Sequence, residues 1–340
     1  MSTSCDFGRP EASWLPEDFL QGLRAFQESR ALLTSIELDV YTAVASGATA
    51  AEVAARLGTD PRATEMLLNA LVALGMLSKQ ETVFRNSPLA ERFLREGCAV
   101  DARAAMMHIV HMWDRWSTLT ECVRAGTSVT YREPEERELK WTEAFIAAMH
   151  ANALQGAPAV VEAVGLPGVR RLLDVGGGSG AYAIAFAQAC PDLQAEVLDL
   201  PRVVRIAEGH IARAGLSDRI KTRGGDLRKD DFGAGWDLVL LSAICHMLGP
   251  EENLDLLRRC HAALAPGGRV VIRDFILELE KTAPRQAALF SLNMLVGTQR
   301  GASYSQPEYT AWLAAAGFEE IRHIALSGPS GLMVGKRPSL

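Results

Sequence analysis

Residues 171–182 read Arg-Leu-Leu-Asp-Val-Gly-Gly-Gly-Ser-Gly-Ala-Tyr, and this stretch decides the fold. A short apolar run that suits a buried strand leads into residues 176–180, of which four are glycine, and an alanine-rich run with helical spacing follows. Because glycine has no Cβ, such a loop lets backbone N–H groups at a helix N-terminus approach a ligand. The stretch therefore predicts a strand, a loop and a helix that bind either a dinucleotide or another nucleotide-like cofactor.

The spacing of the glycines bears on which cofactor binds. In the dinucleotide fingerprint G-x-G-x-x-G, the third glycine falls at Ser179 when counted from Gly176 and at Ala183 when counted from Gly178. An alanine is tolerated there, so a dinucleotide stays open. Asp174, two residues before the first glycine, resembles the acidic residue in the first motif of class I S-adenosylmethionine (SAM)-dependent methyltransferases. The resemblance implies a loop that packs against the methionine part of SAM.

The composition is that of a soluble globular protein. With 340 residues, 48% apolar and 22% charged, the chain is long enough for two domains and a sizeable core. A net charge of −6 argues against nucleic acid as the main partner. No uncharged apolar run reaches the roughly 18 residues of a membrane span, and residues 1–16 lack a signal-peptide core. Six cysteines without a C-x-x-C pair suggest neither zinc nor disulfides, so we expect a cytoplasmic protein.

Residues 18–98 are predicted to be mostly helical. Thr49-Ala-Ala-Glu52 is a capping-box pattern that opens one helix, and Asp60-Pro61 opens the next as N-cap and first turn. That second helix ends at Gly75, and residues 76–84 have the pattern of a small β-wing. The segment resembles a winged helix-turn-helix domain.

A winged helix raises the question of DNA binding. The recognition helix would carry Arg62, Glu65 and Asn69 among many apolar residues, which makes a poor surface for phosphates. We therefore expect this domain to pack against a second subunit and not against nucleic acid. A non-catalytic SAM-binding regulator that uses the winged helix on DNA is the alternative from a different class.

The remainder of the chain is predicted to be an α/β domain preceded by helices. Two helices are expected at 101–124 and 139–164, with an exposed polar loop at 126–138 between them. From residue 170 onward strand and helix patterns alternate, which is typical of a doubly wound, Rossmann-like parallel sheet that a hairpin at 320–326 and 331–335 could close. Strands are predicted near 171–175, 195–199, 219–223, 236–242 and 268–275, and helices near 180–190, 202–214, 251–264, 285–297 and 306–316.

Polar residues follow several of these strands, at the end of the sheet where ligands bind. Asp199 lies about 20 residues beyond the glycine loop, where an acid accepts hydrogen bonds from ribose hydroxyls. Asp226 could take the amino group of an adenine, and Leu227 could pack on its ring. Each residue also has a local interpretation, because Asp199 before Leu200-Pro201 could cap the next helix and Gly224-Gly225 could be a plain turn.

Together the motifs resemble the small-molecule O-methyltransferases of the plant caffeic-acid type and their bacterial relatives. The resemblance covers nearly the whole chain, and its distinctive stretches are 174–180, 199–201, 224–226, the fourth-strand segment that ends in His246, and 265–268. It implies SAM as methyl donor. The cofactor-binding residues that it implies are Asp174, Gly176, Gly178, Gly180, Asp199, Leu200, Asp226, Leu227 and Ser242.

The same resemblance implies the domain organisation. Residues 1–100 would form a winged-helix dimerisation domain, residues 101–165 bridging helices that line the acceptor pocket, and residues 166–340 the SAM-binding catalytic domain. It further implies an obligate homodimer whose second subunit helps to wall the substrate pocket.

The resemblance assigns the general base to His246, the histidine after the fourth strand. A phenol with a pKa near 10 is protonated at neutral pH, and an ordinary histidine, with a pKa near 6.5, is neutral and can accept its proton. Asp274 matches one of the two carboxylates that orient this histidine in the family. The family sequence His-Asp-Trp is replaced by residues 246–248, His-Met-Leu, and the second carboxylate falls at Ser303 and is missing; Glu308 is expected on the following helix.

For the acceptor, the resemblance indicates the bridging helices and the segment after the fifth strand. Methionine and tryptophan suit a flat aromatic molecule because they give apolar contacts of adaptable shape. His108 and His111 have a metal-ligand spacing, but no third ligand follows, so no metal is predicted. The predicted acceptor residues, each of which could also be an ordinary core residue, are Met107, His108, Trp113, Phe145, Met149, Asn293 and Met294.

We therefore predict a homodimeric, SAM-dependent O-methyltransferase that acts on a hydroxyl of a small phenol- or polyketide-like aromatic compound. The missing second carboxylate leaves one alternative open within the same fold, transfer of the methyl group to carbon or nitrogen. No membrane and no nucleic acid are expected as partners.

Overall fold

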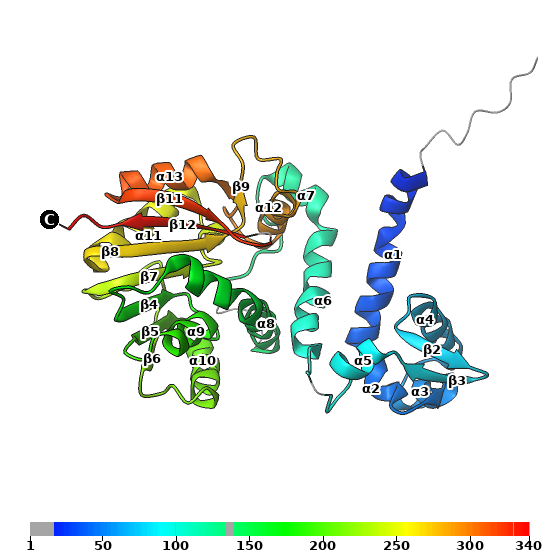
Figure 1. The fold of residues 1–340 in the computed structure, drawn as a ribbon. Helices are drawn as coiled ribbons and strands as arrows, with labels where there is room; N and C mark the ends of the chain where they lie inside the picture. Colours follow the sequence, from blue (N-terminus) through cyan, green and yellow to red (C-terminus); the bar gives the residue numbers. More distant parts are fainter. Residues whose placement is uncertain (1–16, 99, 134–138, 329, 340) are drawn as a thin grey trace, which may run out of the picture. The chain divides into compact units, whose positions relative to one another are not determined.

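The computed structural model describes residues 17–98, 100–133, 139–328 and 330–339. It separates into two compact units, one up to Val110 and one from His111 onward (Figure 1). The predicted three-part division at residues 100 and 165 stays a prediction.

The first unit is a helical domain with a three-stranded antiparallel sheet in the order β1-β3-β2. Thr49 and Glu52 form the predicted capping box, and Asp60 caps the following helix with Pro61 in its first turn. Buried residues from the helices and the sheet, among them Tyr41 and Phe84, form one core. The elements are α1 (Glu17–Glu37), α2 (Val40–Val44), β1 (Ala48–Thr49), α3 (Ala50–Leu57), α4 (Pro61–Ala73), β2 (Leu77–Gln80), β3 (Val83–Asn86) and α5 (Pro88–Phe93).

The predicted wing is the β2–β3 hairpin, and it occupies polar groups of the preceding helix. Lys79 on β2 donates hydrogen bonds to Glu65 at 3.2 Å and to Asn69 at 2.9 Å, both on α4. The residues that would read DNA in a winged helix are therefore partly engaged within the domain itself.

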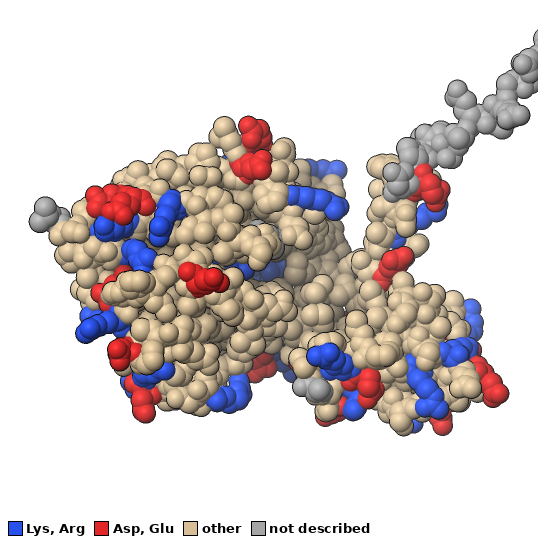
Figure 2. All heavy atoms as spheres, in the orientation of Figure 1, with Lys and Arg blue, Asp and Glu red and all other residues tan. Residues whose placement is uncertain are grey.

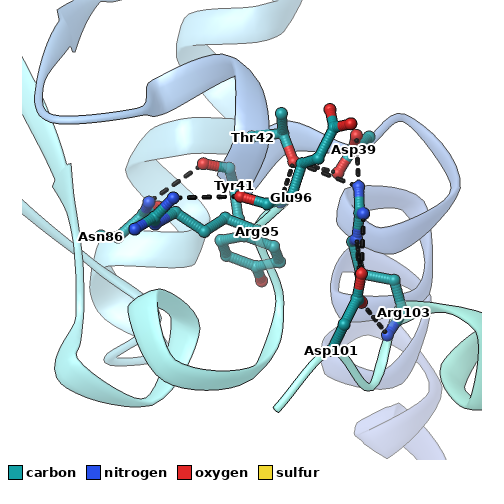
Figure 3. A network of polar contacts seen from close by, with 8 residues as sticks. All are labelled: Asp39, Tyr41, Thr42, Asn86, Arg95, Glu96, Asp101 and Arg103. Carbon is teal, nitrogen blue, oxygen red and sulfur yellow. Dashed lines mark hydrogen bonds and ion pairs between the residues drawn. The ribbon is translucent and has the colours of Figure 1, made fainter. Parts of the chain in front are cut away.

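A polar network joins the start of α6 (Arg103–Ser117) to the turn between α1 and α2 (Figure 3). Arg103 pairs with Asp101 at 2.8 Å and with Asp39 at 3.1 Å, and its guanidinium lowers the pKa of Asp101. Thr42 donates to Asp39 at 2.7 Å and accepts the backbone N–H of Glu96 at 2.9 Å. Such partly exposed ion pairs contribute little free energy, so the network mainly ties the first residues of α6 to the rest of the first unit.

The prediction of one helix over 101–124 is wrong, since two helices occupy this stretch. α6 ends at Ser117, and α7 (Leu119–Ala125) begins two residues later. The N–H and the hydroxyl of Thr118 both donate to the carbonyl oxygen of Arg115, at 3.0 and 2.7 Å. A threonine that bonds back to a nearby carbonyl competes with the regular helical ladder, which accounts for the break.

The second unit contains a seven-stranded sheet in the order β11-β12-β8-β7-β4-β5-β6, in which β12 is antiparallel to both neighbours. The α/β fold is therefore confirmed, including the closing hairpin. β8 begins at Leu264 and not at residue 268, because Leu264 already pairs with Trp236 before a shift in register. The elements are α8 (Leu139–Val164), β4 (Arg171–Val175), α9 (Ala181–Ala189), β5 (Gln194–Asp199), α10 (Pro201–Arg213), β6 (Ile220–Gly224), β7 (Trp236–Ser242), α11 (Pro250–Ala263), β8 (Leu264–Asp274), β9 (Ile276–Leu277), α12 (Arg285–Gly297), β10 (Tyr304–Ser305), α13 (Gln306–Ala315), β11 (Glu319–Ala325) and β12 (Gly331–Lys336).

Helices cover both faces of this sheet, and each face has its own core. Buried residues of α8, α9 and α10 pack on one face, and those of α11 and α13 pack on the other. The strands are apolar on both sides, as in β4 and β7, because neither face meets water. On the side drawn in Figure 2, basic and acidic side chains are interspersed.

α8 is long and apolar enough to cross a membrane when judged by length and composition alone. Its second half supplies Ala153, Ala157, Val160 and Val164 to the core on one face of the sheet. A helix whose apolar residues pack on a sheet in this way is a core helix of the α/β unit.

The outer part of α1 carries an exposed apolar stripe. Phe19, Leu23 and Phe26 follow one another at intervals of four and three residues and are 53%, 58% and 56% exposed. This spacing puts them on one face of the helix. Three large apolar side chains on one exposed face suit the second subunit that the sequence predicts.

We expect the triple variant Phe19→Ser, Leu23→Ser, Phe26→Ser to weaken self-association at least tenfold, because it removes the apolar face that water disfavours. Sedimentation velocity over a concentration series measures this change, and circular dichroism checks that the helices persist. The matched control Gln21→Ser, Gln27→Ser, Glu28→Ser alters exposed polar positions of the same helix. If the variant with three serines dimerises like the wild type, the assignment of this apolar face to the subunit interface is contradicted.

Candidate active site

The glycine loop between β4 and α9 has the backbone conformation that its sequence requires. Gly176, Gly178 and Gly180 have φ angles of 66°, 57° and 74°, a region that other residues rarely adopt. Gly177 is confined by its neighbours, since a Cβ there would lie 2.7 Å from Cγ of Asp174 and 2.9 Å from Cγ1 of Val197. Glycine is therefore required in this loop for two reasons, the positive φ angles and the lack of space for a Cβ.

Most N–H groups of this loop are already used inside the protein. Those of Gly176 and Gly177 donate to the carbonyl oxygen of Leu198, and that of Gly180 donates to Gly177. The N–H of Gly178 donates to Oδ2 of Asp199 at 2.8 Å. A pyrophosphate needs free N–H donors and no adjacent carboxylate, so the loop does not suit the phosphates of a dinucleotide.

Asp199, at the end of β5, is held between two backbone donors. Its Oδ2 accepts from Gly178, and its Oδ1 accepts the N–H of Leu200 at 2.7 Å. Burial raises the pKa of Asp199 to about 6, although both N–H groups oppose the rise. Asp199 is therefore anchored to the glycine loop, and its carboxylate has lone pairs left for a ligand's hydroxyl groups.

Asp174 lies in the interior, beneath the glycine loop. Its side chain is fully buried, and neither carboxylate oxygen accepts a hydrogen bond within 3.5 Å from the described residues. Burial raises the pKa of Asp174 to about 7; the N–H of Ala183 offsets part of this rise, and the charge of Asp199 adds to it. Asp174 thus contacts the loop from inside the protein, through Gly177.

The ends of β6 and β7 lie beside the loop. Gly225 donates its N–H to the carbonyl oxygen of Asp199 at 2.9 Å, which brings the next two residues toward the end of β5. Asp226 accepts the N–H of Arg228 at 2.9 Å through Oδ1, as a local cap, and a Cβ on Gly176 would lie 3.5 Å from Leu227. Ser242 ends β7 and pairs in register with Arg273 of β8. The predicted cofactor residues therefore gather at one edge of the sheet.

His246 and Asp274 form a buried pair at the ends of β7 and β8. His246 Nδ1 lies 2.6 Å from Asp274 Oδ1, and the exposed fractions of the two residues are 6% and 1%. The backbone N–H groups of His246 and Phe275 also donate to this carboxylate, at 3.1 and 2.8 Å. Since an ionised carboxylate can only accept hydrogen bonds, Nδ1 of His246 is the donor in this contact.

Tyr309 on α13 is a further contact of this pair that the sequence analysis missed. Its hydroxyl donates to Asp274 Oδ2 at 3.3 Å. Burial and the charge of Asp274 raise the pKa of Tyr309 well above its usual value, so the hydroxyl stays protonated and remains a donor. Since 35 residues separate the two, nothing local in the sequence points to this contact.

Neither Ser303 nor Glu308 contacts His246 through its side chain in the hydrogen bonds of the described residues. The hydroxyl of Ser303 donates to the carbonyl oxygen of Ala287 at 2.8 Å. Glu308 accepts from the N–H and hydroxyl of Ser305 in a capping box and pairs with Lys281 at 2.7 Å. Asp274 is therefore the carboxylate that orients His246.

An aromatic surface covers His246. Phe290 of α12 meets the imidazole edge-on at 4.8 Å between ring centres and stacks on Phe275 at 4.1 Å. Three residues further along α12, Asn293 accepts a hydrogen bond from Trp116 at 3.0 Å. Phe290, Phe275 and Trp116 were not among the predicted acceptor residues, although Phe290 precedes Asn293 by one helical turn, a spacing that could have indicated it.

The predicted acceptor residues lie on three helices. Asn293 and Met294 lie on α12, and Trp113 lies on the part of α6 that belongs to the second unit. Phe145 and Met149 lie on α8, where Phe145 stacks on Trp141 at 5.4 Å. Met107 and His108 belong to the first unit. The binding of an acceptor by any of these seven residues stays a prediction.

Comparison with known proteins agrees with this geometry. Residues 116–319 match the model of the O-methyltransferase domain, and residues 20–96 match that of the O-methyltransferase dimerisation domain. The chain belongs to the O-methyltransferase family. The members of this family are SAM-dependent.

Similar methyltransferases are found in Streptomyces. The chain is 35% identical to 3-hydroxy-5-methyl-1-naphthoate 3-O-methyltransferase of Streptomyces sahachiroi, over 98% of this chain and 99% of that protein. It is 32% identical to the tetracenomycin polyketide synthesis 8-O-methyl transferase TcmO of Streptomyces glaucescens, over 95% and 97%. It is also 30% identical to an L-tyrosine C(3)-methyltransferase of Streptomyces lavendulae, over 94% and 91%.

Solved structures have the same fold. An O-methyltransferase family protein from Burkholderia thailandensis superimposes with a TM-score of 0.87 and 26% identity, over 96% of this chain and 99% of that one. The structure of PigF with S-adenosylhomocysteine (SAH) superimposes with a TM-score of 0.86 and 27% identity, over 95% and 100%.

The residues of this O-methyltransferase fit SAM better than a dinucleotide. The glycine loop has few free N–H donors for phosphates, and the carboxylate of Asp199 beside it suits ribose hydroxyls. Within the described parts of the chain, no group of three or more His, Cys, Asp or Glu is arranged to hold a metal ion.

We expect Gly177→Ala to lower the free energy of unfolding by about 1–3 kcal/mol, because the new methyl group would overlap Asp174 and Val197. Gly209→Ala is the matched control. It lies in α10 with open space around its Cβ position and should stabilise the helix by about 0.5–1 kcal/mol. Urea unfolding followed by circular dichroism measures the free energy of unfolding of both variants. Equal stability of Gly177→Ala and wild type would contradict the predicted overlap at residue 177.

Proposed function

We propose that this O-methyltransferase moves a methyl group from SAM to a hydroxyl group of a small aromatic acceptor, with His246 as general base. The observation that carries the proposal is the buried His246–Asp274 pair one strand away from the glycine loop. The Streptomyces relatives that methylate a naphthoate hydroxyl and a polyketide hydroxyl support the acceptor class.

SAM would be held at the ends of β4, β5 and β6. When bound, SAM supplies an electrophilic methyl group on a sulfonium ion. Asp199 would accept the ribose hydroxyls, and Asp226 and Leu227 would hold the adenine. Gly176, Gly178 and Gly180, with Leu200 and Ser242, would line the rest of the site, and Asp174 would support the loop from below.

His246 would take the proton of the acceptor hydroxyl at Nε2. The hydrogen bond from Nδ1 to Asp274 fixes the tautomer, which leaves Nε2 as the basic nitrogen. Asp274 also stabilises the imidazolium that forms, and Tyr309 and two backbone N–H groups keep the carboxylate in place. A base in this position raises the negative charge on the acceptor oxygen as the methyl group is transferred.

The acceptor would lie against the aromatic surface of Phe275 and Phe290. These rings exclude water from His246 and offer faces on which a flat aromatic ring can stack. We extend the pocket to Trp113, Phe145, Met149, Asn293 and Met294, all of the second unit.

Transfer to oxygen is favoured over the alternatives, although a single carboxylate orients the base. Asp274 alone supplies the contact that fixes the tautomer of His246, so the absence of a second carboxylate at Ser303 does not remove the base. A 30% identical relative is named as a carbon methyltransferase, so the product must be identified directly. Mass spectrometry with isotope-labelled SAM, followed by fragmentation, locates the methyl group on oxygen, nitrogen or carbon.

Calorimetry should show that SAH binds and that NAD does not. Because Asp199 has a pKa of about 6 and must be ionised to accept ribose hydroxyls, SAH affinity should fall about tenfold between pH 7 and pH 5. Asp199→Asn should weaken binding about 10–100-fold, the range for a hydrogen bond to a charged group, and flatten the pH profile.

The exposed aspartate variant Asp192→Asn is the control and should keep both affinity and pH profile. Binding of NAD without SAH would overturn the proposed cofactor site.

His246→Ala should lower kcat about 10²–10⁴-fold on a hydroxynaphthoate acceptor. Its residual rate should rise about tenfold per pH unit up to the acceptor's own pKa near 10, because the acceptor must then ionise unaided. Asp274→Asn should lower kcat at least tenfold, because the carboxylate that fixes the tautomer of His246 is lost.

His323→Ala, at an exposed histidine of β11, serves as the control for these measurements. Full turnover by His246→Ala on an acceptor that the wild type methylates would exclude the general-base assignment.

A further inference from the structure

A histidine of α8 binds the glycine loop at a residue that no motif assigns. His150 Nδ1 lies 2.8 Å from Oγ of Ser179, which is 4% exposed and stands between two glycines of positive φ. Ile146, one turn earlier on α8, faces the same loop, since a Cβ on Gly178 would lie 3.8 Å from its Cδ1. One face of α8 thus covers residues 178–179.

A second histidine supports the first. The rings of His150 and His210, from α8 and α10, lie 3.8 Å apart between centres and are tilted by 36°. Nη2 of Arg213 lies 3.0 Å from Nδ1 of His210. A guanidinium can only donate, so this nitrogen accepts, and His210 is the neutral tautomer with its hydrogen on Nε2.

The surroundings keep both rings neutral. Burial, followed by Arg213, lowers the pKa of His150; burial, His150 and Arg213 lower the pKa of His210 to about 4. Among the described residues, burial, His150 and Arg213 are the influences on these two pKa values, and the neighbouring α9 carries no acidic or basic residue, its titratable group being the Tyr182 phenol. The nearest carboxylate of the loop, Asp199, is bound to the N–H of Gly178.

We propose that His150 is a positioning residue for SAM: as a neutral imidazole backed by His210, it fixes Ser179 and so holds the glycine loop in its binding shape. The proposal rests on the proposed function, because it takes this loop as the cofactor site. Asp199 binds the N–H of Gly178 and His150 binds the next side chain, so two consecutive residues are held from two different elements. A loop held in this way loses less conformational freedom when a ligand binds.

Calorimetry with SAH tests the contact directly. His150→Ala and Ser179→Ala should each weaken SAH binding about 3–10-fold, as expected for loss of one neutral hydrogen bond. The double variant should bind no more weakly than the weaker single variant, because both changes remove the same interaction. His150→Asn, whose amide can occupy the place of Nδ1, should restore affinity to within about twofold of wild type.

The pH dependence of unfolding tests, without any SAM, whether the His150–His210 pair is neutral in the folded protein. With a pKa near 4 in the folded state and near 6.5 when unfolded, His210 takes up a proton more readily in the unfolded chain. The free energy of unfolding of the wild type should therefore decrease between pH 6.5 and pH 4 more steeply than that of His210→Gln. His323→Ala is the control for the calorimetry and should match wild type in SAH affinity.

The outcomes separate this proposal from the proposed function. If the wild type does not bind SAH, the cofactor site itself is wrong. If the wild type binds SAH but folded His150→Ala binds equally well, or if the losses in the double variant simply add, the positioning role is overturned. Should His150→Ala fail to fold, Ser179→Ala and His150→Asn decide the question by the same comparison.

Discussion

The backbone of the glycine loop packs closely against residues at the carboxyl ends of the parallel strands, and the rest of the site depends on this close packing. β8, β7, β4, β5 and β6 are parallel neighbours, so their carboxyl ends meet along one edge. At that edge the glycine loop lies against Ile244, Asp174 and Val197 with no room for a Cβ at residues 176 and 177. A Cβ at either position would overlap side chains that lie in or just after these strands, so residues 176 and 177 must be glycine as long as those side chains keep their places.

The three aspartates at this edge of the sheet differ in the groups that donate hydrogen bonds to their carboxylates. The Asp174 carboxylate accepts no hydrogen bond within 3.5 Å from the described residues, and burial raises its pKa to about 7 against the weaker effect of the Ala183 N–H. Asp199 has two backbone donors, and burial raises its pKa to about 6. Asp274 receives hydrogen bonds from its histidine, two backbone N–H groups and a tyrosine. Because their positions in the sheet differ, Asp174 lies beneath the glycine loop, Asp199 accepts the N–H groups of Gly178 and Leu200, and Asp274 binds His246.

The departures from the family pattern are accommodated without loss of the pair. Met247, where the family has an aspartate, is 38% exposed and leaves the adjoining His246 buried. Ser303 bonds to a carbonyl of α12, and Tyr309 supplies a contact to Asp274 from the next helix. In this chain Asp274 binds His246 and also accepts a hydrogen bond from the Tyr309 phenol.

The sequence by itself determined the features whose physical cause is local. The strand–glycine–helix stretch at 171–182, the caps at Thr49 and Asp60, and the alternation that makes a doubly wound sheet depend on neighbouring residues, and all were predicted. His246 and Asp274 could be named because His246 lies four residues beyond the end of β7 and Asp274 ends β8, and parallel strands bring such ends together. Their chemical roles came from family resemblance and not from spacing.

Only the tertiary structure decided contacts between residues far apart in the chain. The Tyr309–Asp274 bond spans 35 residues and the His150–Ser179 bond spans 29. Parallel pairing of β9 with β10 brings residues 304–305 beside the end of β8, and no periodicity in the sequence records that pairing. The break of α6 at Thr118 was missed for a related reason, because helical spacing continues across it while two hydrogen bonds to one carbonyl end the helix.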